Sequence, residues 1–151
     1  LVGETVMRLG LRSVRHVVGD ATSYRSPDGG LFDRVLLDAP CSGTAVFAKR
    51  PDMKWKRREE DFVRLSDTQS VMLDNAARLL KPDGVLVYST CTLESEENDS
   101  VVRSFLERFP EFESVLENRF SEFRTECGYL LPPHRAGGAG AYAAKLKRKP
   151  S

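Results

Sequence analysis

The amino-acid sequence predicts an α/β fold in which a largely parallel sheet carries an antiparallel edge. Two apolar segments, residues 32–37 and 85–89, have the near-continuous hydrophobic character of buried parallel strands. Residues 59–80 lie between them and repeat apolar side chains at helical spacing. Such a helix is the usual connection between two parallel strands. A second helical pattern and two more strand patterns follow along the chain.

Length and composition are typical of one globular domain, with 151 residues of which 40% are hydrophobic and 30% charged. The net charge of +1 indicates no particular class of partner. We expect no membrane segment, because no run approaches the ~18 apolar residues that a membrane helix needs. No secretory leader pattern is visible. The chain begins with Leu1 rather than Met, so we expect a piece of a longer protein.

The three cysteines, Cys41, Cys91 and Cys127, are widely spaced and follow neither a disulfide framework nor a metal-ligand pattern. We therefore expect no metal, and reduced thiols in an intracellular reducing compartment such as a cytoplasm, a nucleolus or an organelle matrix. The oligomeric state is not indicated by the sequence, and a monomer is the simplest expectation.

The first part of the chain predicts one helix and two strands. Residues 1–10 have the apolar spacing of a helix, and Gly10 can act as its C-cap. Residues 14–18 form a short apolar strand pattern. The loop at 24–30, rich in Ser, Pro, Asp and Gly, leads into the strand at 32–37. The remaining elements expected, in chain order, are a loop at 38–56, a helix at 59–80, a turn at 81–84, a strand at 85–89, a helix from 92 to 109, a strand at 112–116, an irregular segment at 118–138, a strand at 141–146 and a basic tail over 145–151.

Two cysteines follow the two strong strands. Cys91 comes just after residues 85–89 and just before a predicted helix, whose N-terminus would lower the pKa of a thiol and favour a nucleophile. Taken alone, it fits a buried, apolar cysteine at least as well. Cys41 allows the same two interpretations, and its setting between Pro40 and Ser42 favours an exposed, functional loop. We interpret Cys127 as incidental.

Two aspartates follow predicted strands in the same way. Asp38 ends the strand at 32–37, and Asp20 follows the weaker strand at 14–18. In open α/β sheets, ligands bind beyond the carboxyl ends of the strands. Either acid could therefore hold a ligand, or could cap its own turn by accepting backbone N–H bonds.

A basic run over 49–58 contains Arg50, Lys54 and Trp55. Cations beside an aromatic ring suit phosphate contact and base stacking. Acidic residues follow at once at 59–61, so a solvated helix entrance is the commoner explanation of such a run.

Two motifs together resemble those of the NOL1/NOP2/Sun family of RNA cytosine-C5 methyltransferases. They are Leu37-Asp38-Ala39-Pro40-Cys41-Ser42-Gly43-Thr44 and Tyr88-Ser89-Thr90-Cys91-Thr92, the second followed by Glu97-Asn98. Three shorter pieces agree: Gly19-Asp20-Ala21, Arg50-Pro51-Asp52 before Trp55, and residues 131–135. The resemblance covers roughly residues 9–147.

The resemblance implies a Rossmann-like, S-adenosylmethionine-dependent methyltransferase that acts on rRNA or tRNA. It implies that Cys91 is the nucleophile that adds to the cytosine ring and that Cys41 assists product release. Asp38 would contact the base and help protonate it, and Asp20 and Asp38 would lie at the cofactor. Contacts of Arg50, Lys54 and Trp55 with RNA are a weaker expectation.

The resemblance also implies that this chain is the C-terminal portion of a single catalytic domain. In a sheet of order 3-2-1-4-5-7-6 it would supply strands 3 to 7 and lack the first two. The family's Gly-rich cofactor loop precedes Asp20, and no such stretch is present among the residues before it. We therefore expect this chain alone to bind S-adenosylmethionine weakly and to be less stable than the complete domain. Calorimetry tests this, and micromolar affinity would contradict it.

Smaller departures are Ala45, where the family usually has a second glycine, and Ala139-Gly140-Ala141-Tyr142, where an aspartate usually precedes Gly-Phe-Phe. Two alternatives stay open. One is a non-catalytic RNA-binding remnant of the family, since the cofactor loop is missing. The other is a DNA cytosine-C5 methyltransferase, whose Pro-Cys motif supplies the nucleophile, although the motif around Cys91 argues against that class.

Overall fold

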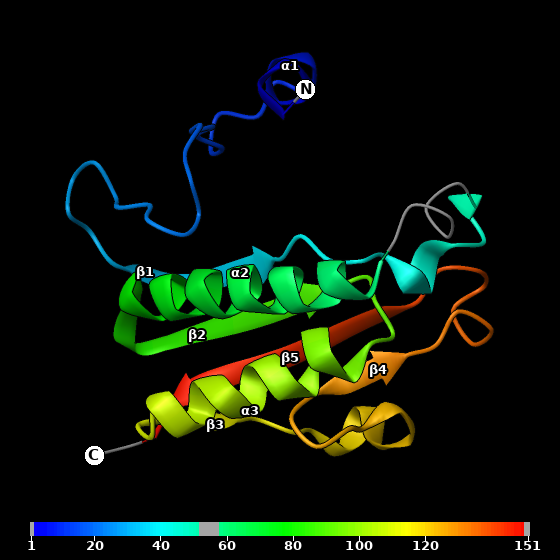
Figure 1. Ribbon diagram of the computed structural model, residues 1–151. Helices are drawn as coiled ribbons and strands as arrows, with labels where there is room; N and C mark the ends of the chain where they lie inside the picture. Colours follow the sequence, from blue (N-terminus) through cyan, green and yellow to red (C-terminus); the bar gives the residue numbers. More distant parts are fainter. Residues whose placement is uncertain (1, 52–57, 150–151) are drawn as a thin grey trace.

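A computed structural model describes residues 2–51 and 58–149 as one twisted sheet with two helices packed on one face (Figure 1). The helices and strands, in chain order, are α1 (Val2–Arg8), β1 (Phe32–Asp38), α2 (Glu59–Arg78), β2 (Leu80–Thr90), α3 (Asp99–Arg108), β3 (Phe112–Ser114), β4 (Tyr129–Leu131) and β5 (Ala141–Arg148). Short 3-10 turns are η1 (Thr44–Val46), η3 (Ser95–Glu97) and η4 (Asn118–Phe123). Among the helices of this described part, none combines the length and apolar character needed to cross a membrane.

The strand order is β1-β2-β5-β3, and β4 pairs with the start of β5, on the same side as β3 and opposite β2. Strands β1 and β2 are parallel, whereas β5 is antiparallel to β2, β3 and β4. This order corresponds to strands 4-5-7-6 of the expected sheet, which confirms the predicted fold class. In the register of the parallel pair, Asp38 faces Ser89. Both strands therefore end at the same edge of the sheet.

The hydrophobic core lies between the sheet and helices α2 and α3. Inward-facing side chains of β2 and β5 alternate along each strand, as in Leu86 and Tyr88 or Ala144 and Leu146. Burying each large apolar side chain contributes about 1.5–3 kcal/mol. The fully buried apolar residues that both helices and the sheet contribute to this core include Leu73, Ala77, Leu80, Leu86, Tyr88, Val102, Phe105 and Leu146.

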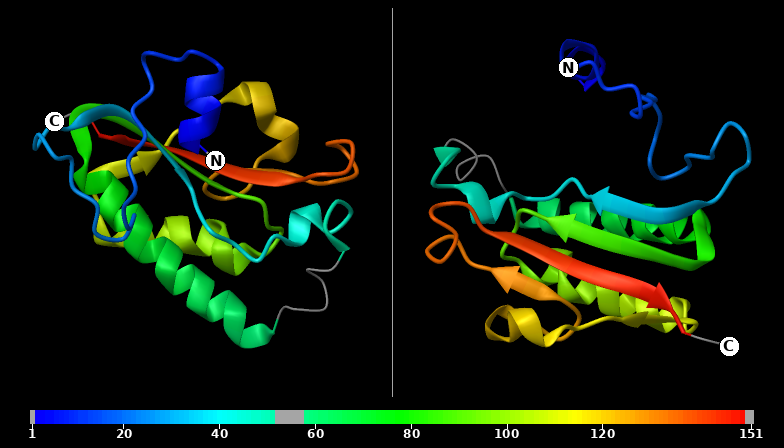
Figure 2. Two further views of the ribbon diagram at one scale, coloured as in Figure 1. Left: turned by 90° about the horizontal axis from the view of Figure 1, so that it is seen from above. Right: turned by 180° about the vertical axis from the view of Figure 1, so that it is seen from behind.

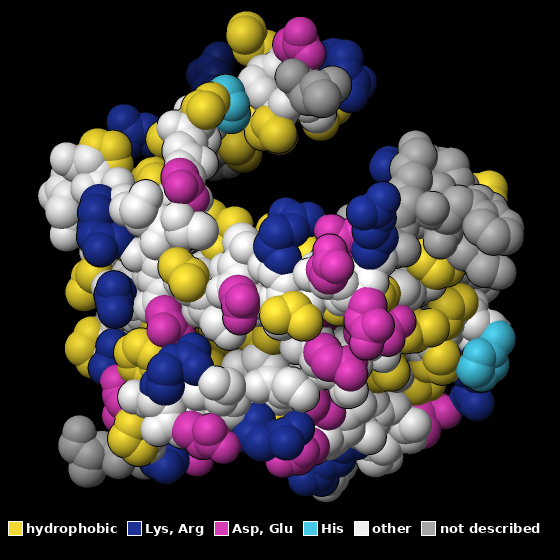
Figure 3. Space-filling view, in the orientation of Figure 1, with side chains coloured by type: hydrophobic (Ala, Val, Ile, Leu, Met, Phe, Trp, Pro, Cys, Tyr) yellow, Lys and Arg dark blue, Asp and Glu magenta, His cyan; other side chains and the backbone are white. Residues whose placement is uncertain are grey.

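On the opposite face of the sheet, no helix pair is present among the described residues, as the view from behind shows (Figure 2). On β1 the side chain of Leu36 is 70% exposed. Helix α1 stands apart from the sheet, at the end of a long N-terminal segment (Figures 1 and 3). Acidic and basic side chains are interspersed over the helix-bearing face of the molecule (Figure 3).

The strand expected at residues 14–18 does not form. These residues are described, have no regular structure and are exposed, with Val18 88% exposed. A strand needs a hydrogen-bonding neighbour, and none of the described strands pairs with this segment. The apolar pattern was therefore insufficient to predict a strand here. The helix before it is confirmed as α1, and Gly10 has the left-handed φ of 63° expected of a C-cap.

Several element boundaries also differ from the prediction. The expected turn at 81–84 bulges out within β2, because Phe32 faces Leu80 while Arg34 already faces Val85. The helix expected from residue 92 begins only at Asp99, because η3 precedes it and Asn98 has non-helical angles. Strand β5 continues through Arg148, so the first residues of the expected basic tail belong to the sheet. The segment expected to be irregular contains η4 and β4, which the sequence pattern did not predict.

Candidate active site

The two cysteine loops meet at the edge of the sheet where β1 and β2 end. The Ala39 N–H donates to the Ser89 carbonyl at 2.9 Å, which continues the pairing of the two strands. Beyond it, the Ala45 N–H donates to the Cys91 carbonyl at 3.1 Å. The parallel register therefore brings together two segments that are 50 residues apart in sequence.

Cys41 and Cys91 lie in direct contact. Their Sγ atoms are 3.2 Å apart, and the Cys91 N–H donates to the Cys41 Sγ at 3.2 Å. Both side chains are half-buried. Burial, followed by the contact with Cys91, raises the pKa of the Cys41 thiol to about 12, so Cys41 carries its proton at neutral pH. Cys127 lies elsewhere and is buried, and its N–H donates to the Asp99 carboxylate at 3.1 Å.

Asp38 ends β1 next to the cysteine pair. Its carboxylate is exposed and accepts a hydrogen bond from the Ser89 hydroxyl at 3.0 Å. Since Ser89 is two residues before Cys91, this bond fixes the carboxylate beside the Cys91 loop while leaving it open to solvent. An acid in this position can contact a ligand placed above the two thiols.

Asp20 lies in the N-terminal segment, where its carboxylate caps a turn. The Thr22 hydroxyl and N–H donate to one oxygen at 2.7 and 2.9 Å, and these bonds lower the pKa of Asp20. Asn75 of α2 holds this turn to the body by donating to the carbonyls of Ala21 and Tyr24 at 3.0 and 3.1 Å. The structure therefore gives Asp20 a turn-capping contact, and leaves its carboxylate on the surface.

A cavity of about 200 Å³ lies between this segment, β1 and α2. It is mostly apolar, and Gly19 and Ala21 on its wall flank Asp20, while Leu37 precedes Asp38. The two aspartates adjoin these lining residues in the sequence, but neither is itself a lining residue. The lining residues are Val17, Gly19, Ala21, Tyr24, Val35, Leu36, Leu37, Met72, Asn75, Ala76 and Leu79.

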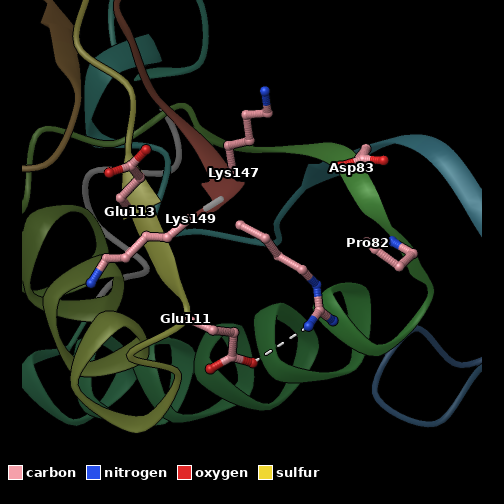
Figure 4. A pocket seen from close by; sticks show the side chains of 7 residues that line it. Pro82, Asp83, Glu111, Glu113, Lys147 and Lys149 are labelled. Carbon is pink, nitrogen blue, oxygen red and sulfur yellow. Dashed lines mark ion pairs between the residues drawn. The ribbon is translucent and has the colours of Figure 1, made fainter. Parts of the chain in front are cut away.

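A second cavity, of about 340 Å³, lies at the other end of the sheet and holds charged side chains of both signs (Figure 4). Lys147 on its wall pairs with Val85, whereas the cysteine end of β2 pairs with Tyr142. Arg148 and Glu111 form an ion pair at 3.7 Å across it. This cavity is therefore remote from the thiols, and we do not assign it to the active site.

Of the expected RNA contacts, Arg50 is exposed and follows η1, on the segment that leads away from Cys41. Its N–H donates to the Val46 carbonyl at 3.0 Å. Lys54 and Trp55 lie outside the described residues.

A buried polar network lies beneath the two loops, and the sequence analysis assigned it no role. The hydroxyls of Ser42 and Thr44 contact the Thr92 hydroxyl at 2.7 and 2.9 Å. Below them lie Glu97 and Gln69, both fully buried. A signal for Gln69 is present in the sequence, because it is a polar residue on the apolar stripe of helix α2.

Comparison with known proteins agrees with this geometry. The 16S rRNA methyltransferase RsmB/F family matches residues 1–147. The chain is 36% identical over 156 residues to the "Probable ribosomal RNA small subunit methyltransferase B" of Bacillus subtilis, covering 99% of this chain and 35% of that protein. It is 40% identical over 154 residues to the ribosomal RNA small subunit methyltransferase B of Yersinia pseudotuberculosis, covering 98% and 34%.

Among solved structures, NSun6 from Pyrococcus horikoshii, determined with SFG, superposes with a TM-score of 0.80 at 29% identity, covering 99% of this chain and 38% of that one. The chain thus spans about a third of the length of the curated relatives that it matches. It shares its fold with the superposed structure, and its two signature motifs meet at one edge of the sheet. The chain belongs to the RsmB/F family of 16S rRNA methyltransferases.

Proposed function

We propose that this chain carries the catalytic thiols of an RNA cytosine-C5 methyltransferase that acts on small-subunit rRNA with S-adenosylmethionine. The observation that carries the proposal is the contact of Cys41 and Cys91, 3.2 Å apart at the carboxyl edge of two parallel strands. Membership of the RsmB/F family and the names of the relatives support RNA as the substrate.

The reaction needs a nucleophile, because C5 of cytosine is too electron-poor to attack a methyl group unaided. In the proposed mechanism the sulfur of Cys91 bonds to C6, and the electron pair displaced from the C5–C6 double bond makes C5 nucleophilic. S-adenosylmethionine, when bound, supplies the electrophilic methyl group. C5 then carries both a methyl group and a proton. Loss of that proton restores the double bond and breaks the bond between C6 and Cys91. The target base must leave its stack to reach the thiols.

Cys41 assists the last step. Its pKa of about 12 keeps the thiol protonated, and its sulfur touches that of Cys91. The S–H group can therefore donate to the Cys91 sulfur as negative charge develops on it. The raised pKa favours this donor role over removal of the C5 proton by Cys41 itself, so that proton would pass to solvent or to another base.

The two aspartates would hold the base and the cofactor. Asp38 is exposed beside Cys91, where its carboxyl group could hydrogen-bond the cytosine ring and deliver a proton as the adduct forms. The apolar cavity between residues 17–24 and β1 offers one wall for the cofactor. Its apolar lining and the adjacent carboxylates fit a group with an adenine ring and a ribose. Arg50, Lys54 and Trp55 are proposed to contact the RNA backbone or stack on its bases.

The test is methyl transfer by the full-length protein that contains this chain. It is incubated with an in vitro transcript of small-subunit rRNA and S-adenosylmethionine labelled in the methyl group, and the nucleosides are separated. The proposal expects label in 5-methylcytidine, and none when Cys91→Ser replaces the nucleophile. Label in another nucleoside, or undiminished transfer by Cys91→Ser, would refute it. No transfer at all would favour a non-catalytic RNA-binding protein.

A further inference from the structure

Glu97 is the only carboxylate among the fully buried residues that the structure describes. Burying a carboxylate is unfavourable unless several donors satisfy it. Here one oxygen accepts from the Ser42 N–H at 2.9 Å and from the Gln69 amide at 2.8 Å. The other oxygen faces the Thr92 hydroxyl at 3.4 Å. Glu97 belongs to η3, so it lies on neither cysteine loop and contacts both.

Glu97 and Gln69 hydrogen-bond the backbone of the residues immediately before and after Cys41. The Gln69 amide that donates to Glu97 also donates to the Pro40 carbonyl at 2.8 Å. Pro40 and Ser42 are the two neighbours of Cys41 in the sequence. The backbone groups on either side of Cys41 are therefore held by one buried pair of side chains, which we call the Glu97–Gln69 clamp.

The nucleophile depends much less on this clamp. Cys91 follows β2 directly, and its carbonyl accepts from the Ala45 N–H at 3.1 Å. The next residue, Thr92, is held through its carbonyl by the Asn98 amide at 3.1 Å, and through its hydroxyl by Ser42 and Thr44. The only bond from Thr92 to Glu97 is long, at 3.4 Å. Loss of the clamp would thus release Cys41 more than Cys91.

We propose that Glu97, through Gln69, is a positioning residue that holds the Cys41 thiol against Cys91 and thereby controls product release. The inference rests on the proposed function for its catalytic consequence, while its geometric part concerns the two thiols alone. Without the clamp, Cys91 can still attack the base, but the proton donor needed for its departure is misplaced.

The geometric part is tested in the full-length protein without RNA or cofactor. The oxidant diamide, a diazene, takes two electrons and two protons from a pair of thiols and becomes the hydrazine, while the thiols become a disulfide. Peptide mass spectrometry follows the Cys41–Cys91 disulfide with time. Glu97→Ala should slow its formation about tenfold, as expected for loss of hydrogen bonds to a charged group. Formation at the wild-type rate would overturn the proposal.

Two further variants separate positioning from general damage. In Glu97→Gln, the amide oxygen can accept from Ser42 and Gln69 while the amide nitrogen faces Thr92, so disulfide formation should stay within about twofold of wild type. Asp99→Ala is the matched control, because Asp99 also accepts several bonds, from Tyr142, Thr125 and Cys127, but none from the cysteine loops. It should leave the rate within the same range. Equal slowing by Asp99→Ala would mean that destabilisation explains the effect. If Glu97→Ala fails to fold, Gln69→Leu must show the slowing instead.

The catalytic part is tested with the small-subunit rRNA transcript and S-adenosylmethionine, by protein–RNA adducts that survive denaturing gels. Glu97→Ala should accumulate adduct as Cys41→Ala does, whereas Asp99→Ala should not. Adduct with Cys41→Ala but none with Glu97→Ala would overturn the role in product release. If no variant forms adduct and yet Glu97→Ala slows disulfide formation, the proposed function fails and the clamp remains supported.

Discussion

Strand β1 and residues 14–18 are both apolar segments that precede an aspartate, yet only β1 becomes a strand. Strand β1 has β2 beside it and α2 packed against one face, whereas residues 14–18 have neither neighbour in the described structure. The comparison extends to the sites that follow. Asp38 stands at a fixed place beside Cys91, while Asp20 caps a surface turn. An apolar pattern alone therefore does not produce a strand that can carry a binding site. The segment must also pair with a neighbouring strand and have one face packed against a helix.

The largest expected difference is in stability. Leu86→Ala in β2 removes a fully buried side chain beneath the helices and should lower the free energy of unfolding by about 2–5 kcal/mol. Val18→Ala in the exposed segment should change it by less than about 0.5 kcal/mol. Urea unfolding of both variants makes the comparison. A large loss with Val18→Ala would show that this segment is packed in solution.

The Asn75 side chain, which joins the N-terminal segment to α2, should contribute to stability by an intermediate amount. Asn75 is buried in α2 and donates to the carbonyls of Ala21 and Tyr24. Asn75→Ala should lower the free energy of unfolding by about 1–3 kcal/mol, since the tether is lost and two acceptors lose their partner. Limited proteolysis within residues 21–31 should also become faster. Unchanged cleavage would mean that Asn75 does not hold the segment.

The free energy of unfolding should also depend on pH, through the Cys41 thiol. The folded-state pKa of Cys41 is about 12, above its ordinary value, so its contribution to stability is complete below that ordinary value and is lost as pH rises toward 12. Burial raises the pKa of Tyr88 and of Tyr142 as well, so they act in the same direction. Urea unfolding at pH 8 and pH 11 should show a smaller decline for Cys41→Ala than for wild type. An equal decline would contradict a buried Cys41 thiol.

The smallest effect on stability is expected at β1, the outermost strand of the described sheet. Lys81 and Asp33 form an ion pair at 2.9 Å between two largely exposed side chains. Lys81→Ala should therefore change the free energy of unfolding by no more than about 1 kcal/mol, and less at high salt. A larger, salt-independent loss would show that this edge is shielded from solvent, which would weaken the distinction between the two regions.

The sequence predicted those parts of the fold whose signal is local. Residues 32–37 and 85–89 are apolar and bounded by breakers, and the stripe of α2 repeats at helical spacing, so the scaffold and the meeting of the two cysteine loops could be anticipated. The strand at 14–18 failed because strand formation depends on a neighbour that a local pattern does not report. Strand β4 was missed because its residues, Tyr129, Leu130 and Leu131, show no alternation of polar and apolar side chains, whereas residues 112–116 do.

The site residues likewise divide into those with a local sequence signal and those without one. Cys41, Cys91 and Asp38 were predicted as candidates because small polar residues and thiols follow apolar strands. The burial of Glu97 and Gln69 was not predicted, because it depends on donors from residues 28 and 55 positions away in sequence. In the sequence, Glu97 stands out only as part of the motif around Cys91. Only the fold shows that it turns inward.

The most direct test of the central claim is the fate of the covalent intermediate in the two cysteine variants. The full-length protein carrying Cys41→Ala or Cys91→Ala is incubated with the small-subunit rRNA transcript and S-adenosylmethionine, and denaturing gels report adducts. We expect Cys41→Ala to accumulate a protein–RNA adduct, because Cys91 still attacks but departs slowly, and Cys91→Ala to form none. An adduct with Cys91→Ala and none with Cys41→Ala would reverse the two roles and contradict the account.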